Sequence, residues 1–286
     1  MKGILVATDF SERSASAVAR AATLAKSLGA PLTLAHIVDE DLPDRLASAM
    51  QAEGKALLET LGADLDRAHG LSPQLATPIG EPYAEILGVA DRADAGLIVL
   101  GSHRRNLIRN TFVGTTAERC IRASRLPVLV ARSADAAPYR HPLMALDLNE
   151  HDLYPLRSAD ALGLVDAQNL TIVFAFDLPT DYSLLRRAGA TEGELQRYLT
   201  EREDAVRPQA ERLLQTADAG YGQLLLKPAA VNAYDPILEA ATESSADLIV
   251  VGTKRKQAFD RFRIGSVSEA ILRRADMDVL VIPPTE

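Results

Sequence analysis

The sequence predicts an α/β protein made of two tandem doubly wound units, each a five-stranded parallel sheet with helices on both faces. Three observations favour this fold class. Short apolar runs alternate with longer segments whose apolar residues recur at helical spacing, as in βαβ units. The length of 286 residues suits two domains. A glycine-bounded loop occurs twice, since Gly101 and Gly114 are 13 residues apart and so are Gly252 and Gly265.

The first half begins with an apolar strand that turns into a helix. Either Asp9 or Ser11 can cap this helix, and Gly29 with Pro31 ends it, because glycine suits the left-handed residue after a helix and proline cannot continue one. The predicted strands are 3–8, 32–38, 74–77, 97–100 and 128–130, and the predicted helices are 12–28, 43–69, 82–92 and one that starts at 115. The buried side chains of the second helix are predicted to be Leu46, Met50, Leu57, Leu58 and Leu61.

The second half repeats the first. Residues 143–147 align with 5–9 at an offset of 138, whereas later positions such as Tyr83 and Tyr234 align at an offset of 151. The difference indicates an insertion between 177 and about 230, where a charged helix is predicted over 192–215. Residues 133–138 are small and polar and end in proline, so they are predicted to link domain 1–133 to domain 139–286.

Composition restricts the classes of function. With 47% hydrophobic and 24% charged residues the chain is typical of globular proteins, and a net charge of −8 argues against a general nucleic-acid binder. No apolar stretch reaches the roughly 18–20 residues that span a bilayer, so no membrane partner is expected. The single cysteine, Cys120, is expected to be a small core residue, and a cytoplasmic location is expected.

The repeated loop is basic although the chain is acidic. Residues 101–114 contain three arginines and no acidic residue, and residues 252–265 contain five lysines or arginines and one aspartate. Each loop follows a strand and leads into a predicted helix, whose first N–H groups and positive dipole end favour an anion. The loops therefore predict a small anionic ligand, and solvated loops are the alternative interpretation.

Ligands of open parallel sheets bind at the carboxyl ends of strands, where the strand order reverses. A nucleotide in that crevice would place its phosphates at the helix start after Gly114 or Gly265. Its base or ribose would lie near Asp9 or Asp147. An aspartate between a strand and a helix is also a common helix cap, so both aspartates have a structural alternative.

The whole chain resembles the tandem-domain members of the universal stress protein family. The residues that carry the resemblance are Ala7-Thr8-Asp9-Phe10-Ser11, His36-Ile37-Val38, the loop 101–114 with Thr115-Thr116-Ala117-Glu118, Pro127-Val128-Leu129-Val130, Asp147, Gly252 and Gly265-Ser266-Val267-Ser268-Glu269. ATP-binding members of the family carry a glycine, two residues, a glycine, nine residues, and then a glycine with a hydroxyl residue. This chain keeps the outer glycines and the hydroxyl in both halves, but Arg104 and Arg255 replace the middle glycine.

The resemblance implies a cytoplasmic stress-response protein that binds ATP or a related adenine nucleotide, with Mg²⁺, in one or both halves. Such a protein acts through its conformation or by binding a partner. The alternative is an interaction module that takes no nucleotide, or another anionic ligand, because an arginine at the middle position can fill part of the phosphate site. The candidate nucleotide-binding residues are Ala7, Thr8, Asp9, Ile37, Leu100, Gly101, Arg104, Gly114, Thr115, Thr116, Asp147, Ala175, Val251, Gly252, Arg255, Gly265, Ser266, Val267 and Ser268.

The resemblance also implies how the two halves meet. In the family the last strand of each unit mediates pairing, so residues 128–130 and 279–281 are expected to form an internal pseudo-dimer. Pairing of whole chains into a homodimer stays open.

The sequence carries none of the common enzyme signatures. It has no P-loop, no Gly-x-Gly-x-x-Gly and no Gly-x-Ser-x-Gly, and its five histidines do not cluster at metal-ligand spacing. His36 lies within a predicted strand and is expected to be a satisfied core residue. No catalytic or metal-binding residue is expected, and weak ATP hydrolysis is the most that an enzyme interpretation allows.

Overall fold

The computed structural model describes residues 2–102, 116–133, 136–148, 153–216, 220–253 and 264–284. The first half contains β1 (Gly3–Ala7), α1 (Glu12–Leu28), β2 (Leu32–Ala35), α2 (Asp44–His69), β3 (Gln74–Ala76), α3 (Pro82–Arg92), β4 (Ala95–Gly101), α4 (Thr116–Ala123) and β5 (Val128–Ala131). The second half contains β6 (Pro142–Leu146), α5 (Tyr154–Ala161), β7 (Thr171–Asp177), α6 (Thr180–Arg187), α7 (Glu192–Gln215), β8 (Gln223–Ala229), α8 (Tyr234–Glu243), β9 (Leu248–Gly252), α9 (Ser266–Arg274) and β10 (Asp278–Ile282). Strands alternate with helices in both halves, as predicted.

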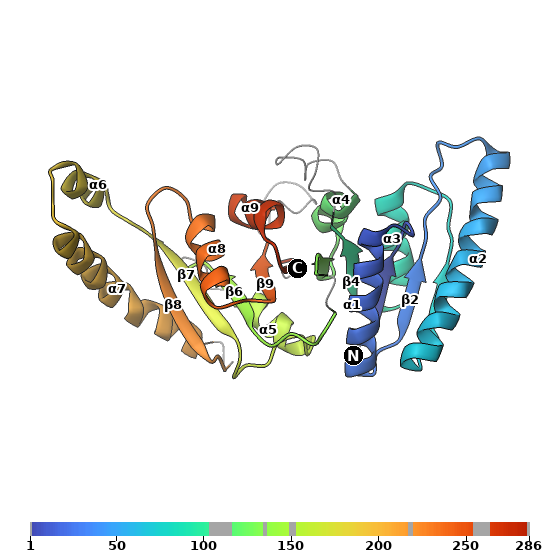
Figure 1. Cartoon of the computed structure of the whole chain (residues 1–286), viewed down its shortest axis with the longest axis horizontal. Coiled ribbons are helices and arrows are strands. Elements are labelled where there is room, and N and C mark those ends of the chain that lie inside the picture. Colours follow the sequence, from blue (N-terminus) through green and yellow to red (C-terminus); the bar gives the residue numbers. More distant parts are fainter. Residues whose placement is uncertain are drawn as a thin grey trace.

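The described strands form one sheet in the order β3-β2-β1-β4-β5-β10-β9-β6-β7-β8. Within each half neighbouring strands are parallel, whereas β5 and β10 pair antiparallel, with Val130 opposite Val279 and Val128 opposite Val281. The last strands of the two halves therefore pair inside one chain. The halves lie side by side, with α2 at one end of the molecule and α6 and α7 at the other (Figure 1).

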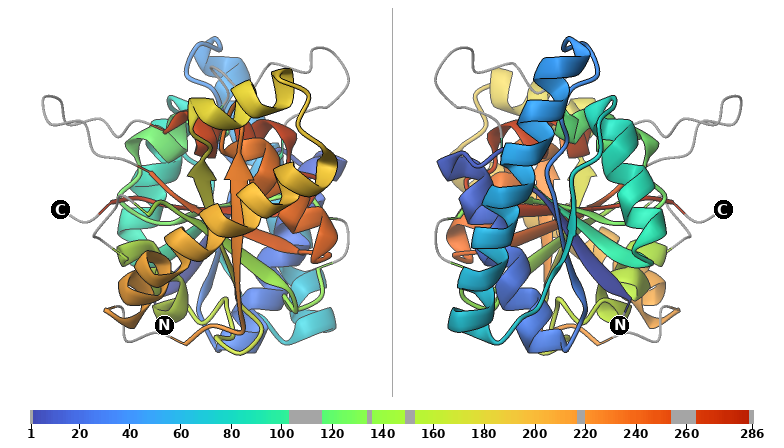
Figure 2. Two further views of the ribbon diagram at one scale, coloured as in Figure 1. Left: turned by 90° about the vertical axis from the view of Figure 1, so that its left-hand side faces the viewer. Right: turned by 90° about the vertical axis from the view of Figure 1, so that its right-hand side faces the viewer.

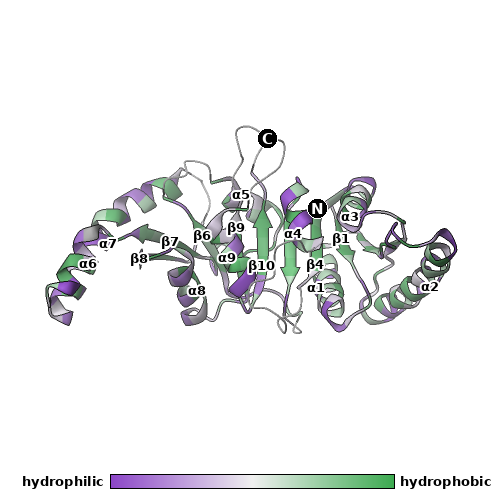
Figure 3. Ribbon diagram, turned by 90° about the horizontal axis from the view of Figure 1, so that it is seen from above, coloured by the Kyte–Doolittle hydropathy of each residue, from purple (hydrophilic) through white to green (hydrophobic). Residues whose placement is uncertain are grey.

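Two apolar cores lie on opposite faces of this sheet. Alternate side chains of β5 belong to different cores, Leu129 and Ala131 to one and Val128 and Val130 to the other. The first core includes residues of α1, α2, α5 and α7, and the second includes residues of α3, α4, α8 and α9. Both cores extend across the two halves. Helices cover both faces of the twisted sheet (Figure 2), and the central strands are the most hydrophobic part of the molecule (Figure 3).

The predicted buried face of α2 is wrong in part. Leu58 is fully buried and Leu61 is half-buried, but Leu46, Met50 and Leu57 are 47%, 42% and 41% exposed. The helix has 26 residues, whereas the strands beside it, β2 and β3, have four and three. At about 1.5 Å per helical residue and about 3.3 Å per strand residue, α2 is much longer than the sheet edge that it covers. Part of its apolar surface therefore faces solvent.

A buried polar cluster joins the two halves beside the β5–β10 pair. Asp278 is fully buried, and its Oδ2 accepts hydrogen bonds from Arg20 Nε at 2.9 Å and from the Tyr139 hydroxyl at 2.7 Å. Its Oδ1 accepts from the backbone N–H groups of Arg132 at 2.7 Å and Ser133 at 3.0 Å. Burial, together with the charge of Asp278, raises the pKa of Tyr139 well above its usual range, so the phenol stays a hydrogen-bond donor. The cluster links α1 and the connecting segment to the first residue of β10.

No helix within the described ranges is both long enough and apolar enough to cross a bilayer.

Candidate functional site

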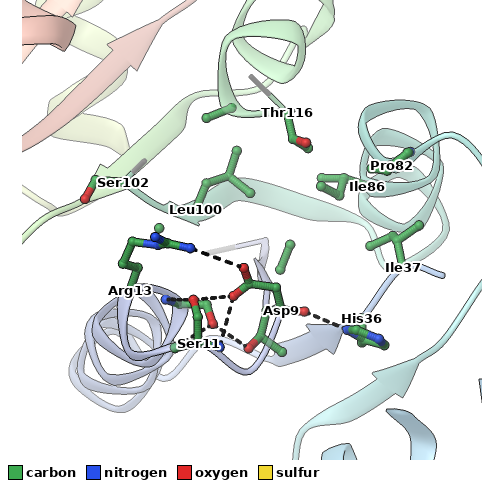
Figure 4. A pocket seen from close by; sticks show the side chains of 15 residues that line it. Asp9, Ser11, Arg13, His36, Ile37, Pro82, Ile86, Leu100, Ser102 and Thr116 are labelled. Carbon is green, nitrogen blue, oxygen red and sulfur yellow. Dashed lines mark hydrogen bonds and ion pairs between the residues drawn. The ribbon is translucent and has the colours of Figure 1, made fainter. Parts of the chain in front are cut away.

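The candidate site lies at the carboxyl ends of β1 and β4. Strand order reverses here, because β1 pairs with β2 on one side and with β4 on the other, and such points bind ligands in doubly wound sheets. A cavity of about 510 Å³ opens between these strand ends and the first turns of α1, α3 and α4 (Figure 4). A volume of this size is typical of small-molecule sites.

The cavity brings together several predicted residues and adds others. Seven of the predicted nucleotide-binding residues line it: Ala7, Thr8, Asp9, Ile37, Leu100, Gly101 and Thr116. Sequence reasoning did not assign the others to the site: Ser11, Arg13, Ser14, His36, Pro82, Ile86, Ser102 and Ala117. The predicted residues Arg104, Gly114, Thr115 and Arg255 lie outside the described residues. Of the residues that were missed, Arg13 could have been found from its spacing, because it follows Asp9 by four residues at the start of a helix and could pair with it.

The turn between β1 and α1 orients the carboxylate of Asp9. Its Oδ1 accepts hydrogen bonds from the Ser11 backbone N–H at 3.1 Å and from Ser11 Oγ at 2.5 Å. Ser11 is the N-cap of α1, since its side chain accepts from the Ser14 N–H at 3.4 Å. Oδ2 lies 4.0 Å from the Arg13 guanidinium. Asp9 therefore orients the capping residue with one oxygen and offers the other to the cavity.

The surroundings of Asp9 stabilise the ionised form of its carboxyl group. Burial raises the pKa of this carboxyl, but hydrogen bonds from Ser11 and Ser14 and the positive charge of Arg13 lower it more, so the net pKa is below its ordinary value. At neutral pH the carboxylate is ionised and can only accept hydrogen bonds.

A chain of hydroxyl groups holds the same turn. The buried Thr8 donates from Oγ1 to Ser14 Oγ at 3.0 Å, and Ser14 Oγ donates to the Ser11 carbonyl at 2.9 Å. Thr8 Oγ1 also accepts from the Phe10 N–H at 3.0 Å. Phe10 has a φ of 60°, a left-handed conformation that non-glycine residues adopt only when their surroundings enforce it. The hydrogen bonds therefore fix a strained turn at the mouth of the cavity.

His36 lies on the cavity wall and not in a strand, so its predicted place is wrong. The strand β2 ends at Ala35, and His36 is half-buried with Nδ1 2.9 Å from the Thr8 carbonyl oxygen. Since a carbonyl only accepts, Nδ1 carries the proton that forms this bond. Phe10 lies 4.6 Å from its ring, and Gly54 of α2 makes room, because a Cβ there would lie 2.5 Å from His36 Cδ2. The ring is held on several sides.

The two walls of the cavity differ in chemistry. Figure 4 shows Ile37, Pro82, Ile86 and Leu100 on one side, facing Asp9, Ser11 and Arg13 on the other. An apolar wall suits a flat ring, and a polar wall suits hydroxyl groups and charge.

Gly101 allows the polar wall to lie close to β4. A Cβ on Gly101 would lie 2.8 Å from the Arg13 carbonyl oxygen, so only glycine permits this approach of the first turn of α1.

The corresponding region of the second half is arranged differently. The predicted residues Asp147, Ala175, Val251, Gly252, Gly265, Ser266, Val267 and Ser268 lie at or near the carboxyl ends of β6, β7 and β9 and the start of α9. Ser268 Oγ donates to the Gly252 carbonyl at 2.7 Å, and Gly265 is the N-cap of α9 without a capping side chain. A Cβ on Gly252 would lie 3.0 Å from Pro155 Cγ, so a proline ring takes the place that the α1 backbone has beside Gly101.

Cys120 is a residue of α4 and is buried in the second core. Burial raises the pKa of its thiol to about 12, so almost no thiolate forms at pH 8. We expect no reaction with Ellman's reagent in the native protein at pH 8 and complete reaction in urea. Rapid labelling of the native protein would contradict the burial of Cys120.

Among the residues that the structure describes, no group of three or more His, Cys, Asp or Glu side chains could hold a metal ion.

Comparison with known proteins identifies the family. The Universal stress protein family matches residues 1–132 and, a second time, residues 138–283. The chain belongs to the universal stress protein family.

Individual members of the universal stress protein family match over different lengths. One from Mycobacterium tuberculosis is 24% identical over 298 residues, which cover 98% of this chain and 96% of that relative. The crystal structure of one from Archaeoglobus fulgidus has a TM-score of 0.66 at 17% identity and covers 98% of both chains, which supports the tandem fold. A universal stress protein in complex with cAMP is 26% identical, covers 46% of this chain and 96% of that chain, and has a TM-score of 0.38.

Proposed function

We propose that this universal stress protein binds an adenine nucleotide in the cavity of its first half and acts through a change of conformation or through a partner that reads the bound state. The observation that carries the proposal is the two-sided cavity at the β1–β4 reversal point. A purine ring would pack against the apolar wall of Ile37, Pro82, Ile86 and Leu100. The free oxygen of Asp9 would accept a hydrogen bond from a ribose hydroxyl.

The phosphates farther from the sugar would lie toward the start of α4. Thr116 is the first residue of this helix, is exposed and lines the cavity, so its hydroxyl and the N-terminal end of the helix face the same space. Helix N-termini favour phosphate through unpaired N–H groups and the helix dipole. Mg²⁺, where present, would be held by the phosphates of the ligand.

The family gives this proposal a context, since one member is in complex with cAMP. We further propose that the protein acts in the cytoplasm and that its two domains are 1–133 and 139–286. The alternative is an interaction module without a nucleotide, in which Arg104 and Arg255 close the phosphate sites.

Isothermal titration with ATP, AMP and cAMP, with and without Mg²⁺ at near-physiological salt, tests the proposal. We expect binding in the micromolar to millimolar range, with one site per chain if only the first half binds and two if both do. No heat at millimolar nucleotide would contradict the proposal. The double variant Arg104→Gly with Arg255→Gly separates the alternatives: newly gained ATP binding favours the interaction module, whereas loss of existing binding makes the arginines ligands.

A further inference from the structure

We infer that Arg13 binds the phosphate nearest the sugar of the ligand and makes the first-half cavity selective for nucleotides over nucleosides. The inference rests on the proposed function and adds to it a specificity-determining residue.

Arg13 combines a fixed backbone with available donors. It is the second residue of α1, and its guanidinium lies beside the cavity and points toward Asp9 (Figure 4). Its terminal nitrogen is 4.0 Å from Asp9 Oδ2, at the outer limit of an ion pair, and the side chain is 37% exposed. A guanidinium group has five N–H donors in a planar fork. Within the described ranges, this one long contact leaves most of those donors available to a ligand in the cavity.

The backbone of Arg13 is held by its neighbours on both sides. Its carbonyl packs against Gly101 at the end of β4, at a distance that a Cβ would not allow. The next residue, Ser14, is buried and takes part in the hydrogen bonds of Ser11 and Thr8. The guanidinium therefore starts from a rigid point beside the cavity, which reduces the entropy lost when it binds an anion.

The place of this charge in the helix favours a role in binding over a role in helix stability. A cation in the first turn of a helix is opposed by the positive end of the helix dipole. The nearby charge of Asp9 compensates for this only across a long contact, so an anion in the cavity would improve the surroundings of Arg13. Asp9 alone would repel a phosphate, and Arg13 offsets that repulsion.

Asp9 and Arg13 together match the chemistry of a sugar phosphate. Asp9 Oδ2 can accept a hydrogen bond from a sugar hydroxyl, while Arg13 donates to a phosphate a few ångströms away. A nucleoside offers only the first of these interactions. At the offset of 138, His151 occupies the equivalent position of the second half and lies outside the described residues, so the selectivity is assigned to the first half.

The test compares AMP with adenosine by isothermal titration at low and at physiological salt. For the unmodified chain we expect AMP to bind at least about tenfold more tightly than adenosine, as charge-assisted hydrogen bonds to phosphate require. Arg13→Gln should weaken AMP about tenfold and leave adenosine within about twofold, so that the preference nearly disappears. Arg13→Lys should keep part of the preference, because the charge remains and the planar fork does not.

Arg67→Gln is the matched control. Arg67 is an exposed arginine of α2, paired with Asp64 at 2.7 Å and absent from the cavity lining, so its removal should change neither affinity. If Arg13→Gln binds AMP with the unchanged preference, the phosphate is held elsewhere and the inference fails while nucleotide binding stands. If the unmodified chain binds neither AMP, ATP nor adenosine, the proposed function fails and the inference fails with it.

Discussion

Replacement of Asp278 by alanine is expected to lower the free energy of unfolding by about 3–5 kcal/mol, the range for breaking a buried ion pair. The carboxylate is fully buried and accepts four hydrogen bonds from Arg20, Tyr139, Arg132 and Ser133. Its loss would remove this carboxylate from beside the buried Arg20 side chain, which is only 3% exposed. Urea unfolding followed by far-ultraviolet circular dichroism measures the change.

Asp64→Ala is the control for this prediction. Asp64 and Arg67 form an ion pair at 2.7 Å, close to the 2.9 Å of Arg20 and Asp278, but their side chains are 56% and 78% exposed. An exposed pair of this kind contributes about 0.2–1 kcal/mol. Equal losses of stability in the two variants would show that the cluster between the halves adds nothing beyond a surface contact.

Replacement of Asp9 by asparagine is expected to weaken nucleotide binding by about 10- to 150-fold, the factor for a hydrogen bond to a charged acceptor. The amide can keep an oxygen at the Oδ1 position, where Ser11 donates twice, so the turn should survive. At the Oδ2 position it places an N–H donor where the cavity now has an acceptor. A ribose hydroxyl could no longer donate there. Titration with AMP measures the affinity of the variant.

Asp39→Asn serves as the control, because Asp39 is an exposed aspartate after β2 that does not line the cavity. It removes the same charge from the same end of the sheet. An equal fall in affinity for both variants would mean that the overall charge matters and that the Asp9 hydrogen bond does not. If Asp9→Asn binds AMP with unchanged affinity, Asp9 does not contact the nucleotide.

Much of the fold follows from local sequence signals. The bounds of α1 are those predicted from helical periodicity with capping and terminating residues, and the bounds of α3 and α7 are those predicted from their sequence pattern alone. The structure adds a capping box between Thr191 and Glu194 at the start of α7. The predictions fail where tertiary contacts determine which side chains are buried. The spacing of Leu46, Met50 and Leu57 identifies an apolar face of α2, but only the length of the adjoining strands shows that part of this face is left uncovered. The short helix α6 was not predicted.

Site residues at strand ends could be predicted from the sequence, whereas those on helices could not. The ends of strands can be recognised in a sequence, and parallel strands bring their carboxyl ends to one edge of the sheet. Ala7 to Asp9 and Leu100 with Gly101 could therefore be predicted. Arg13, Pro82 and Ile86 reach the cavity from helices. Their placement depends on the order β2-β1-β4 and on the packing of α1 and α3 on opposite faces of the sheet, which periodicity does not determine.

A crystal structure of the protein grown with AMP tests the central claim most directly. The account predicts AMP at the carboxyl ends of β1 and β4, with its base beside Ile37 and Ile86, a ribose hydroxyl on Asp9 Oδ2, and its phosphate within reach of Arg13. AMP bound only in the second half, or a first-half cavity that stays empty at saturating AMP, would contradict it.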